Sequence, residues 1–592
     1  MRVASPVSVV LTVLGVVVAA VAGSAAAGEP VFHDAAAELG LEFHHFNGMT
    51  GEFLFPEMTG QGGAFFDYDD DGDLDVYLVQ GGLLGPGKTL ADAIAPPPAG
   101  TPPGDRLFRN DLGAGPGGAP RFVDVTARSG LTATGYGMGV ATGDVDNDGR
   151  VDLYVTNHGA NELWINRGDG TFVEEAEARG VADSSWSTSA AFADLDADGW
   201  LDLYVVNYVD FDVVRNPTCY ATSTRRDYCG PSAFPPLSDR LFLNRGNGRF
   251  AEATSQRLTS YRPGPGLGVA AADFDGDGRL DVFVANDGAE NQLWRQRANG
   301  TFADDSLFAG VAVNRQGRPE ASMGVAVGDF DLDGDFDLFL THLMGETNTL
   351  YLNDDGLFED RTLESGLAAP SSPYTAFGTL PVDFDNDGDE DLFAVNGAVR
   401  ILEAQAAAGD PYPLKQPNQL FENRGGRFVE VGAMAGPSFA IPEVSRGAAA
   451  GDVDNDGDVD VLLLNNNGAA RLLLNQTTSP PPSPPSPSPS LASRPSSSSP
   501  SPSPWLGWDL RSPSGRPAIG ARVVTRPANG PALHRRVATD GSYCAANDPR
   551  TLAGLGSSHN VREVEVIWPN GTTTRFLQPS TASYHVHQRP LP

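Results

Sequence analysis

Seven times along the chain, a run of alternating acidic residues leads directly into a run of apolar residues. Each acidic run follows the pattern D-x-D-x-D-G-x-x-D, and its last Asp opens a run such as DVYLV at 75–79 or DLFLT at 337–341. Short runs rich in β-branched and aromatic residues are typical of β-strands. The pattern predicts a repeated unit of roughly 50 residues with insertions, and its copies start at Asp67, Asp144, Asp194, Asp273, Asp329, Asp383 and Asp452.

Three further features recur around each acidic run. A small residue lies five positions before the first Asp, at Gly62, Gly139, Ser189, Gly268, Gly324, Gly378 and Gly447. A Leu-x-x-Asn sequence follows the apolar run, beginning at Leu107, Leu163, Leu241, Leu293, Leu350, Leu420 and Leu472, although the fourth copy has Gln296 in place of Asn. In all copies but the last, a turn then leads to a Phe, as in NRGDGTFVE. Each repeat is therefore predicted to contribute four short strands.

Four antiparallel strands repeated seven times predict an all-β fold, a seven-bladed β-propeller over residues 31–476. The small residue before each acidic run suits an inner strand, where the blades crowd the central axis. The piece VFHD at 31–34 precedes the first repeat, and no Phe piece follows Leu472. We expect this N-terminal piece to complete the last blade and so remove free sheet edges. An open solenoid is the alternative.

The region after the repeats has a different composition. Residues 477–504 are rich in Ser and Pro, a composition that cannot pack a core and predicts an extended linker. Residues 505–586 alternate apolar and polar positions over short runs, as in VREVEVIW, and predict a small all-β domain. We expect the linker to leave the orientation of this domain unfixed.

Charge and composition narrow the class of protein. The 592 residues contain 40 basic and 76 acidic side chains, a formal charge of −36 that argues against nucleic acid as a partner. The 69 glycines and 46 prolines indicate many turns. Residues 1–27 combine one Arg, an apolar stretch and Ala25-x-Ala27, which predicts a secretory signal peptide, with an uncleaved anchor as the alternative. The mature chain is then expected outside the cytoplasm, in a cell wall, matrix or periplasm, with no membrane span.

The three cysteines are consistent with a protein that is exported from the cytoplasm. Cys219 and Cys229 lie ten positions apart and could form a disulfide in an oxidising compartment, with two free thiols as the alternative. Cys544 has no neighbour in the sequence and is expected to be a buried small residue.

The acidic runs carry the main candidate chemistry. Oxygen ligands at positions 1, 3, 5 and 9, with a backbone carbonyl near position 7, match the six to eight ligands that Ca²⁺ takes, and Gly at position 6 permits a sharp turn. An EF-hand would need Glu at position 12, but this position is aliphatic in all seven copies, as at Leu78 and Val155. Acidic turns without metal are the alternative.

We number these runs as acidic loops 1 to 7 and expect about seven structural Ca²⁺. The predicted ligands are Asp67, Asp69, Asp71 and Asp75; Asp144, Asp146, Asp148 and Asp152; Asp194, Asp196, Asp198 and Asp202; Asp273, Asp275, Asp277 and Asp281; Asp329, Asp331, Asp333 and Asp337; Asp383, Asp385, Asp387 and Asp391; and Asp452, Asp454, Asp456 and Asp460. Four aspartates in each of seven loops make 28 of the 76 acidic residues, so much of the acidity is assigned to metal ligation.

The repeats resemble FG-GAP/VCBS repeats, which also build the calcium-binding blades of integrin α-subunits. IGARV at 519–523, LAGLG at 552–556 and VEVIWPNG at 564–571 resemble the ASPIC/UnbV domain. The combination is similar to the cartilage acidic protein 1 family of secreted calcium-binding proteins. The resemblance implies a secreted propeller with interaction or adhesion roles.

Two kinds of function remain open besides a structural wall or matrix component. Long insertions at 81–104, 208–238 and 397–417 should share the rim opposite the acidic loops and could bind an extracellular protein or glycan. Alternatively, a calcium-stabilised propeller enzyme could use a central funnel on that face. Its candidate residues are His44, His45, His158, His342, Glu57, Glu320, Glu443 and Arg446. No nucleophile elbow, metalloprotease motif, phosphate loop or dinucleotide fingerprint occurs in the sequence, which disfavours an enzyme.

Overall fold

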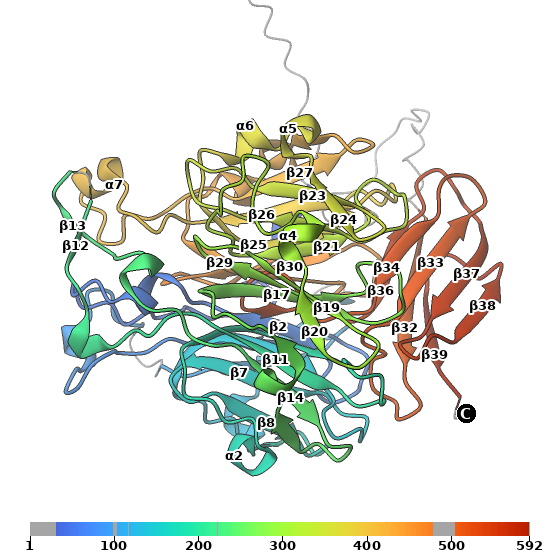
Figure 1. Ribbon diagram of the computed structural model, residues 1–592, viewed down its shortest axis with the longest axis horizontal. Coiled ribbons are helices and arrows are strands. Elements are labelled where there is room, and N and C mark those ends of the chain that lie inside the picture. Colours follow the sequence, from blue (N-terminus) through green and yellow to red (C-terminus); the bar gives the residue numbers. More distant parts are fainter. Residues whose placement is uncertain (1–30, 99–102, 116–117, 222, 478–503, 591–592) are drawn as a thin grey trace, which may run out of the picture.

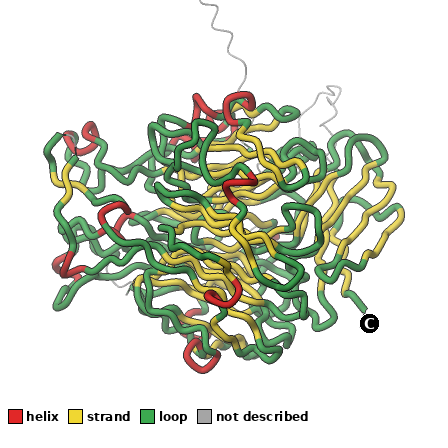
Figure 2. The backbone as a smooth tube through the Cα atoms, viewed as in Figure 1, coloured by secondary structure: helices red, strands yellow, loops and turns green. Residues whose placement is uncertain are grey.

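A computed structural model describes residues 31–98, 103–115, 118–221, 223–477 and 504–590. Strands are the main regular structure of these residues, and the helices are short (Figure 2). The prediction of an all-β fold is confirmed. The predicted signal peptide at 1–27 and most of the predicted linker at 477–504 lie outside the described residues.

Seven sheets in the described ranges share one four-stranded antiparallel meander, here called a blade. The first four contain β2 (Gly63–Phe66), β3 (Asp75–Leu78), β4 (Arg106–Asn110) and β5 (Phe122–Asp124); β6 (Tyr136–Gly143), β7 (Asp152–His158), β8 (Glu162–Asn166) and β9 (Phe172–Glu174); β10 (Ser187–Ala193), β11 (Asp202–Asn207), β14 (Arg240–Asn244) and β15 (Phe250–Glu252); and β17 (Gly266–Ala272), β18 (Asp281–Asn286), β19 (Gln292–Gln296) and β20 (Phe302–Asp304). A two-residue strand, β16 (Leu258–Thr259), adds to the outer edge of the fourth.

The other three blades follow the same order. They contain β21 (Val325–Gly328), β22 (Asp337–Leu340), β23 (Thr349–Asp354) and β24 (Leu357–Asp360); β25 (Ala376–Val382), β26 (Asp391–Asn396), β27 (Gln419–Asn423) and β28 (Phe428–Glu430); and β29 (Ser445–Gly451), β30 (Asp460–Asn465), β31 (Arg471–Asn475) and β1 (Phe32–Asp34). In the last blade β1 pairs with β31 in the register Phe32 to Asn475. The prediction that the N-terminal piece completes the last blade is confirmed.

The inner strands form a closed ring. Each inner strand contacts that of the next blade, from β2 through β6, β10, β17, β21 and β25 to β29, which returns to β2. A closed ring is inconsistent with the open solenoid. The crowding expected at the axis is found: a Cβ at Gly139 would lie 2.6 Å from the carbonyl oxygen of Thr188 in the next blade.

Hydrophobic cores lie between neighbouring blades. Tyr154 of the second blade packs with Phe192 and Leu203 of the third, and Phe283 of the fourth packs with Leu338 of the fifth.

Single-turn helices follow the outer strands of six blades: α1 (Thr126–Ser129), α2 (Ala176–Arg179), α3 (Thr254–Arg257), α4 (Ser306–Ala309), α5 (Thr362–Ser365) and α8 (Gly432–Ala435). Among the helices of the described ranges, none has the length and apolar character that a membrane span requires.

The C-terminal residues form two packed sheets. One contains β32 (Trp505–Arg511), β36 (Thr551–Gly554) and β39 (Tyr584–Gln588), and the other contains β33 (Arg522–Pro527), β34 (Leu533–Arg536), β37 (Val561–Ile567) and β38 (Thr573–Leu577). Their shared core includes Trp508, Val564 and Trp568. We call this part the C-terminal domain; it lies at one end of the ring, on the right of Figure 1.

Candidate metal centres

Every acidic loop joins the inner strand of its blade to the second strand. Acidic loop 1, for example, connects β2 to β3, and acidic loop 7 connects β29 to β30. Because the inner strands of a propeller run in the same direction, the seven loops lie at one end of the ring, which we call the acidic rim. The three long insertions join second to third strands and lie at the other end, the insertion rim.

The seven loops share one backbone conformation. Position 4 has a positive φ between 56° and 69° in every loop, at Asp70, Asn147, Ala197, Gly276, Leu332, Asn386 and Asn455. Gly, Asn and Asp adopt this left-handed conformation readily, whereas Ala and Leu do so at a cost. Ala197 and Leu332 are therefore held there by the rest of the loop, which indicates that the loop shape matters in every copy.

Position 9 anchors the loop to the blade. In acidic loop 1, Asp75 accepts hydrogen bonds from the backbone nitrogens of Tyr68 and Asn110, at 2.9 and 2.8 Å. The same pair of bonds occurs in the other six loops, at 2.6 to 3.4 Å. Each position-9 carboxylate thus ties the loop to the third strand, a role beyond the metal ligation expected from the sequence.

Carboxylate oxygens from different positions converge inside the loops. Oxygens from three aspartates lie within 4.8 Å of one another in each of acidic loops 1 to 5, at positions 1, 3 and 5 or at positions 1, 3 and 9. Several buried carboxylate oxygens of the described residues have no hydrogen-bond donor: one each from Asp146, Asp194, Asp275, Asp329, Asp383, Asp385 and Asp454. Buried polar atoms are normally paired, so these oxygens are free to accept a cation.

Burial raises the pKa of the position-1 carboxyls. The pKa reaches about 6 for Asp67, Asp144 and Asp194, and about 7 for Asp329 and Asp383, chiefly because burial disfavours the charged form. A bound cation would offset this cost. Hard oxygen donors with a flexible geometry suit Ca²⁺ better than Mg²⁺, which keeps several waters. The residues present therefore fit calcium.

The Asn of each Leu-x-x-Asn sequence joins neighbouring blades. Its side-chain nitrogen donates to the position-2 carbonyl of the preceding blade's acidic loop, as from Asn166 to Tyr68 at 2.8 Å. The other donors are Asn110, Asn244, Asn353, Asn423 and Asn475, with Gln296 making the same bond to Leu195 in the copy that departs from the motif. We call these bonds the asparagine clasps. They connect all seven acidic loops into one ring.

The C-terminal domain lies against the acidic rim, contrary to the expectation of an unfixed orientation. Arg516, which is 5% exposed, donates to the Asn147 side chain of acidic loop 2 and to the Gly199 carbonyl of acidic loop 3, at 2.7 and 3.1 Å. Four more arginines contact acidic loops 1, 5, 6 and 7: Arg511, Arg522, Arg535 and Arg550. Positive side chains on one domain therefore meet acidic loops on the other.

The contacts of these arginines were not predicted from the sequence, although the distribution of charge along the chain contains a signal for them. Residues 505–590 contain ten Arg and five acidic residues, in a chain whose formal charge is −36. Such an asymmetry between two regions of one chain indicates that they attract each other.

A loop of the C-terminal domain fills the central channel from the acidic rim. Residues 537–548 run along the channel, and within them β35 (Ala545–Ala546) pairs in parallel with β2. Ser542 exchanges two backbone hydrogen bonds with Val325 of the fifth blade, and the Cys544 nitrogen donates to Ser189 of the third. Cys544 is a buried free thiol, as expected. We call this loop the channel plug.

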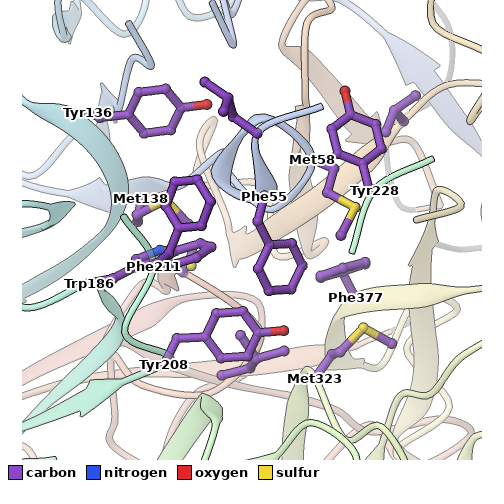
Figure 3. Close-up of a cluster of buried hydrophobic side chains, with 14 of the residues drawn as sticks. Phe55, Met58, Tyr136, Met138, Trp186, Tyr208, Phe211, Tyr228, Met323 and Phe377 are labelled. Carbon is purple, nitrogen blue, oxygen red and sulfur yellow. The ribbon is translucent and has the colours of Figure 1, made fainter. Parts of the chain in front are cut away.

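The other mouth of the channel is filled by the chain before the first blade. The short 3-10 helix η1 (Phe55–Met58) is buried, and Figure 3 shows Phe55 and Met58 among side chains from several blades, including Met323 and Phe377. The two fillings meet where the Tyr543 hydroxyl donates to the Thr59 carbonyl at 2.8 Å. The channel is thus occupied by packed side chains from both ends.

The insertions meet above this filled mouth. Cys219 and Cys229 form the predicted disulfide, which closes the hairpin of β12 (Cys219–Tyr220) and β13 (Arg226–Asp227). This hairpin lies beside α7 (Glu403–Ala407), left in Figure 1, with Ser223 and Arg225 both contacting Glu403. Insertions of the third and sixth blades therefore form one continuous surface on the insertion rim.

The residues proposed for an enzyme do not form one group. His342 and Glu320 lie 3.8 Å apart, and Arg446 donates to four backbone carbonyls while stacking on Phe377. Glu443 instead pairs with Arg471.

Of the remaining candidates, His45 and Glu57 are buried, His158 is half-buried and His44 is exposed. Burial lowers the pKa of His45 and of His342 to about 3, and His158 packs on Trp186. In the described residues, packed side chains occupy the place where a funnel was expected.

Comparisons with known proteins match both parts of the chain. The model of the FG-GAP-like repeat matches residues 144–205, 232–284, 273–340 and 329–394, and the ASPIC and UnbV model matches residues 511–589. Human cartilage acidic protein 1 is 28% identical over 359 residues, 58% of this chain and 46% of that protein. The mouse protein is 27% identical over 332 residues, 54% of this chain and 44% of its own length. The chain thus spans about half the length of the curated relatives it matches.

Solved structures resemble the chain more distantly. A structure of BBS1N in complex with ARL6DN aligns with a TM-score of 0.36 and 9% identity, covering 75% of this chain and 97% of that chain. An Agrocybe aegerita lectin that recognises non-reducing terminal N-acetylglucosamine aligns with a TM-score of 0.32 and 15% identity, covering 55% and 74%.

Proposed function

Because the chain is built of FG-GAP-like repeats followed by an ASPIC and UnbV domain, we propose that it is an exported binding protein whose scaffold is held rigid by calcium. The seven acidic loops each hold one Ca²⁺ through aspartates at positions 1, 3, 5 and 9. The observation that carries this proposal is the repeated loop: it has one backbone conformation in seven copies, and in acidic loops 2 to 7 it contains a buried carboxylate oxygen that lacks a donor among the described residues.

Calcium has a structural role in this proposal. Each ion offsets the cost that burial imposes on the charged carboxylates. It also fixes the loop whose position-2 carbonyl accepts the asparagine clasp. Seven ions bring the formal charge of −36 to about −22. The ring then stays rigid at the rim where neighbouring blades are joined.

The insertion rim is the proposed binding face, for an extracellular protein or glycan. Loops on a rigid scaffold commonly carry binding residues. Here the disulfide hairpin and α7 support each other, and Val214 and Tyr220 are exposed there at 84% and 63%. Catalysis has less support, because side chains fill the channel where an active site would need room.

Two measurements test the proposal. The first is the metal content of the purified chain, with thermal melts before and after chelation; we expect close to seven Ca²⁺ per chain and a lower Tm without them. The second is a pull-down from extracellular matrix with the wild-type chain and with a variant whose 208–238 hairpin is replaced by a short turn. Absence of calcium would refute the scaffold role, and unchanged capture by the variant would refute the binding face.

A further inference from the structure

The seven acidic loops differ in what surrounds their first aspartate. In acidic loops 1 to 5, as far as the structure describes them, this carboxylate accepts only from its own loop; Asp273, for example, accepts from the backbone nitrogens of Asp277 and Gly278. In acidic loops 6 and 7 the C-terminal domain supplies an additional donor. Two of the seven candidate metal centres are therefore shared between domains.

In acidic loop 6 the added donor is a backbone nitrogen. Gly554 donates to one oxygen of Asp383 at 3.0 Å, and Gly388 of the loop itself donates to the same oxygen at 3.2 Å. The other oxygen of Asp383 is buried and has no donor among the described residues. Arg535 adds a bond to the Gly388 carbonyl at 3.0 Å. One carboxylate oxygen is thus fixed from outside while the other is left to face an ion.

In acidic loop 7 the added donor is a hydroxyl. Tyr584 donates to Asp452 at 3.0 Å, on the oxygen that also accepts from Gly457 at 2.9 Å. Arg550 covers the same loop through bonds to the Asp452 carbonyl at 2.7 Å and the Asn455 side chain at 2.6 Å.

The C-terminal domain also covers acidic loop 7 and lowers the exposure of that loop to solvent. Its position-3 and position-5 carboxylates, Asp454 and Asp456, are partly buried, whereas Asp69 and Asp71 of acidic loop 1 are exposed. An ion in acidic loop 7 would therefore have less access to solvent than an ion in acidic loop 1.

We propose that the C-terminal domain completes the metal centres of acidic loops 6 and 7, so that ions held there leave only after the domain has moved away. The inference rests on the proposed calcium binding of the loops. Hydrogen bonds to a ligand's second oxygen fix its orientation and strengthen metal binding. By linkage, calcium in these two loops stabilises the docked domain as much as the docked domain stabilises that calcium.

Exchange of radioactive calcium measures this directly. The full chain is loaded with ⁴⁵Ca²⁺, mixed with excess unlabelled Ca²⁺, and sampled over time by rapid gel filtration. We expect two ions per chain to exchange slowly and the others to exchange quickly.

Tyr584→Phe isolates acidic loop 7. The variant keeps the ring that packs 5.3 Å from Trp505 and 4.6 Å below Arg550, and it loses only the donor to Asp452. It should reduce the slow class from two ions to one with total binding unchanged. Tyr220→Phe, at a tyrosine 63% exposed on the insertion rim, is the matched control and should keep both slow ions.

Gly554→Ala isolates acidic loop 6. Its Cβ would lie 2.5 Å from the Asn386 Cα and from the Asp383 carboxylate, which forces this strand away from the loop. Because Tyr584→Phe keeps the slow ion of acidic loop 6, Gly554→Ala should lose that ion. A single exchange phase for all bound ions, or two slow ions in both variants, would overturn the inference and leave calcium binding intact. A chain that binds no calcium would overturn the proposed function itself.

Discussion

The side-chain nitrogen of Asn110 in the first blade donates a hydrogen bond to the Val453 carbonyl in the seventh, 3.1 Å away and 343 positions along the chain. This clasp lies at the seam where the ring closes. The same seam is closed by the pairing of β1 with β31. The last and first repeats are thus joined by a side-chain bond as well as by a shared sheet.

The asparagine clasp at the seam should contribute measurably to stability. We expect Asn110→Ala to lower the free energy of unfolding by about 1 to 3 kcal/mol, because it leaves the buried Val453 carbonyl without a donor. Asn247→Ala, in an exposed turn, is the matched control. Urea unfolding in saturating Ca²⁺ measures both, and equal stabilities would show that the clasp is dispensable.

Single ligand changes should remove single ions. Asp331 occupies position 3 of acidic loop 5, so Asp331→Asn should lower the calcium content by one ion per chain and reduce the Tm. Asp335, at position 7, is expected to contribute its backbone carbonyl, and its side chain instead accepts from Asp355 at 2.8 Å. Asp335→Asn should therefore keep the full content. Metal analysis of both variants decides, and a loss in both would reject this division of roles.

Glu57 should make stability depend on pH. Burial raises its pKa to about 7, only partly opposed by hydrogen bonds from Tyr228 and Leu54. Because the folded pKa exceeds the unfolded value of 4.5, the stability present below about pH 4.5 is lost as pH rises through 7.

Glu57→Gln removes this penalty. We expect the variant to exceed the wild type by at most about 3 kcal/mol at pH 8 and to match it near pH 4. Unfolding at both pH values, with the exposed Glu177→Gln as control, measures the difference. A difference that does not vary with pH would contradict the prediction.

Arg516 should hold the C-terminal domain on the acidic rim. Arg516→Ala removes charged hydrogen bonds to two acidic loops, and we expect about 2 kcal/mol of stability to be lost. Arg516→Lys keeps the charge without the fork that reaches both loops, so it should rescue only in part. Arg575→Ala, at a 62% exposed side chain paired with Glu565, serves as control in thermal and urea unfolding. A full rescue by Lys would mean that charge alone suffices.

The disulfide should stabilise the insertion rim and leave the metal centres unaffected. Closing a loop with a sequence separation of 10 is worth about 3 kcal/mol in the chain-entropy model. The double variant Cys219→Ser with Cys229→Ser should therefore speed proteolysis of the 208–238 hairpin. Its calcium content should equal that of the wild type, and a lower content would link the two rims.

Much of the fold could be predicted because it repeats. A pattern found seven times identifies the strands, the loops between them and the small inner residues such as Gly139, since each copy supports the others. The role of Asn in Leu-x-x-Asn could not be read from the sequence, because its acceptor belongs to another blade. Gln296 shows how this position is constrained. It replaces the Asn of the motif in the fourth copy, and its side-chain amide still donates to the Leu195 carbonyl.

Contacts that occur only once in the molecule could not be predicted from the sequence. Tyr543 and Cys544 lie in an ordinary polar stretch, and only the tertiary structure places them in the channel. The Ser/Pro-rich composition of 477–504 described the connection but carried no information on how the domains dock. Likewise the sequence could not show what fills the channel: His158 and Arg446, proposed as catalytic residues, instead pack on Trp186 and Phe377.

The pairing of β1 with β31 also determines when β1 can pair during synthesis of the chain. At about 5 to 20 residues per second, the ribosome needs roughly 20 to 90 seconds to travel from Phe32 to its partner Asn475. During that time β1 has no partner from the seventh blade, and the channel plug, further still along the chain, does not yet exist. The earliest described strand is therefore among the last to pair, and any factor that protects the nascent chain must shield that strand for roughly 20 to 90 seconds.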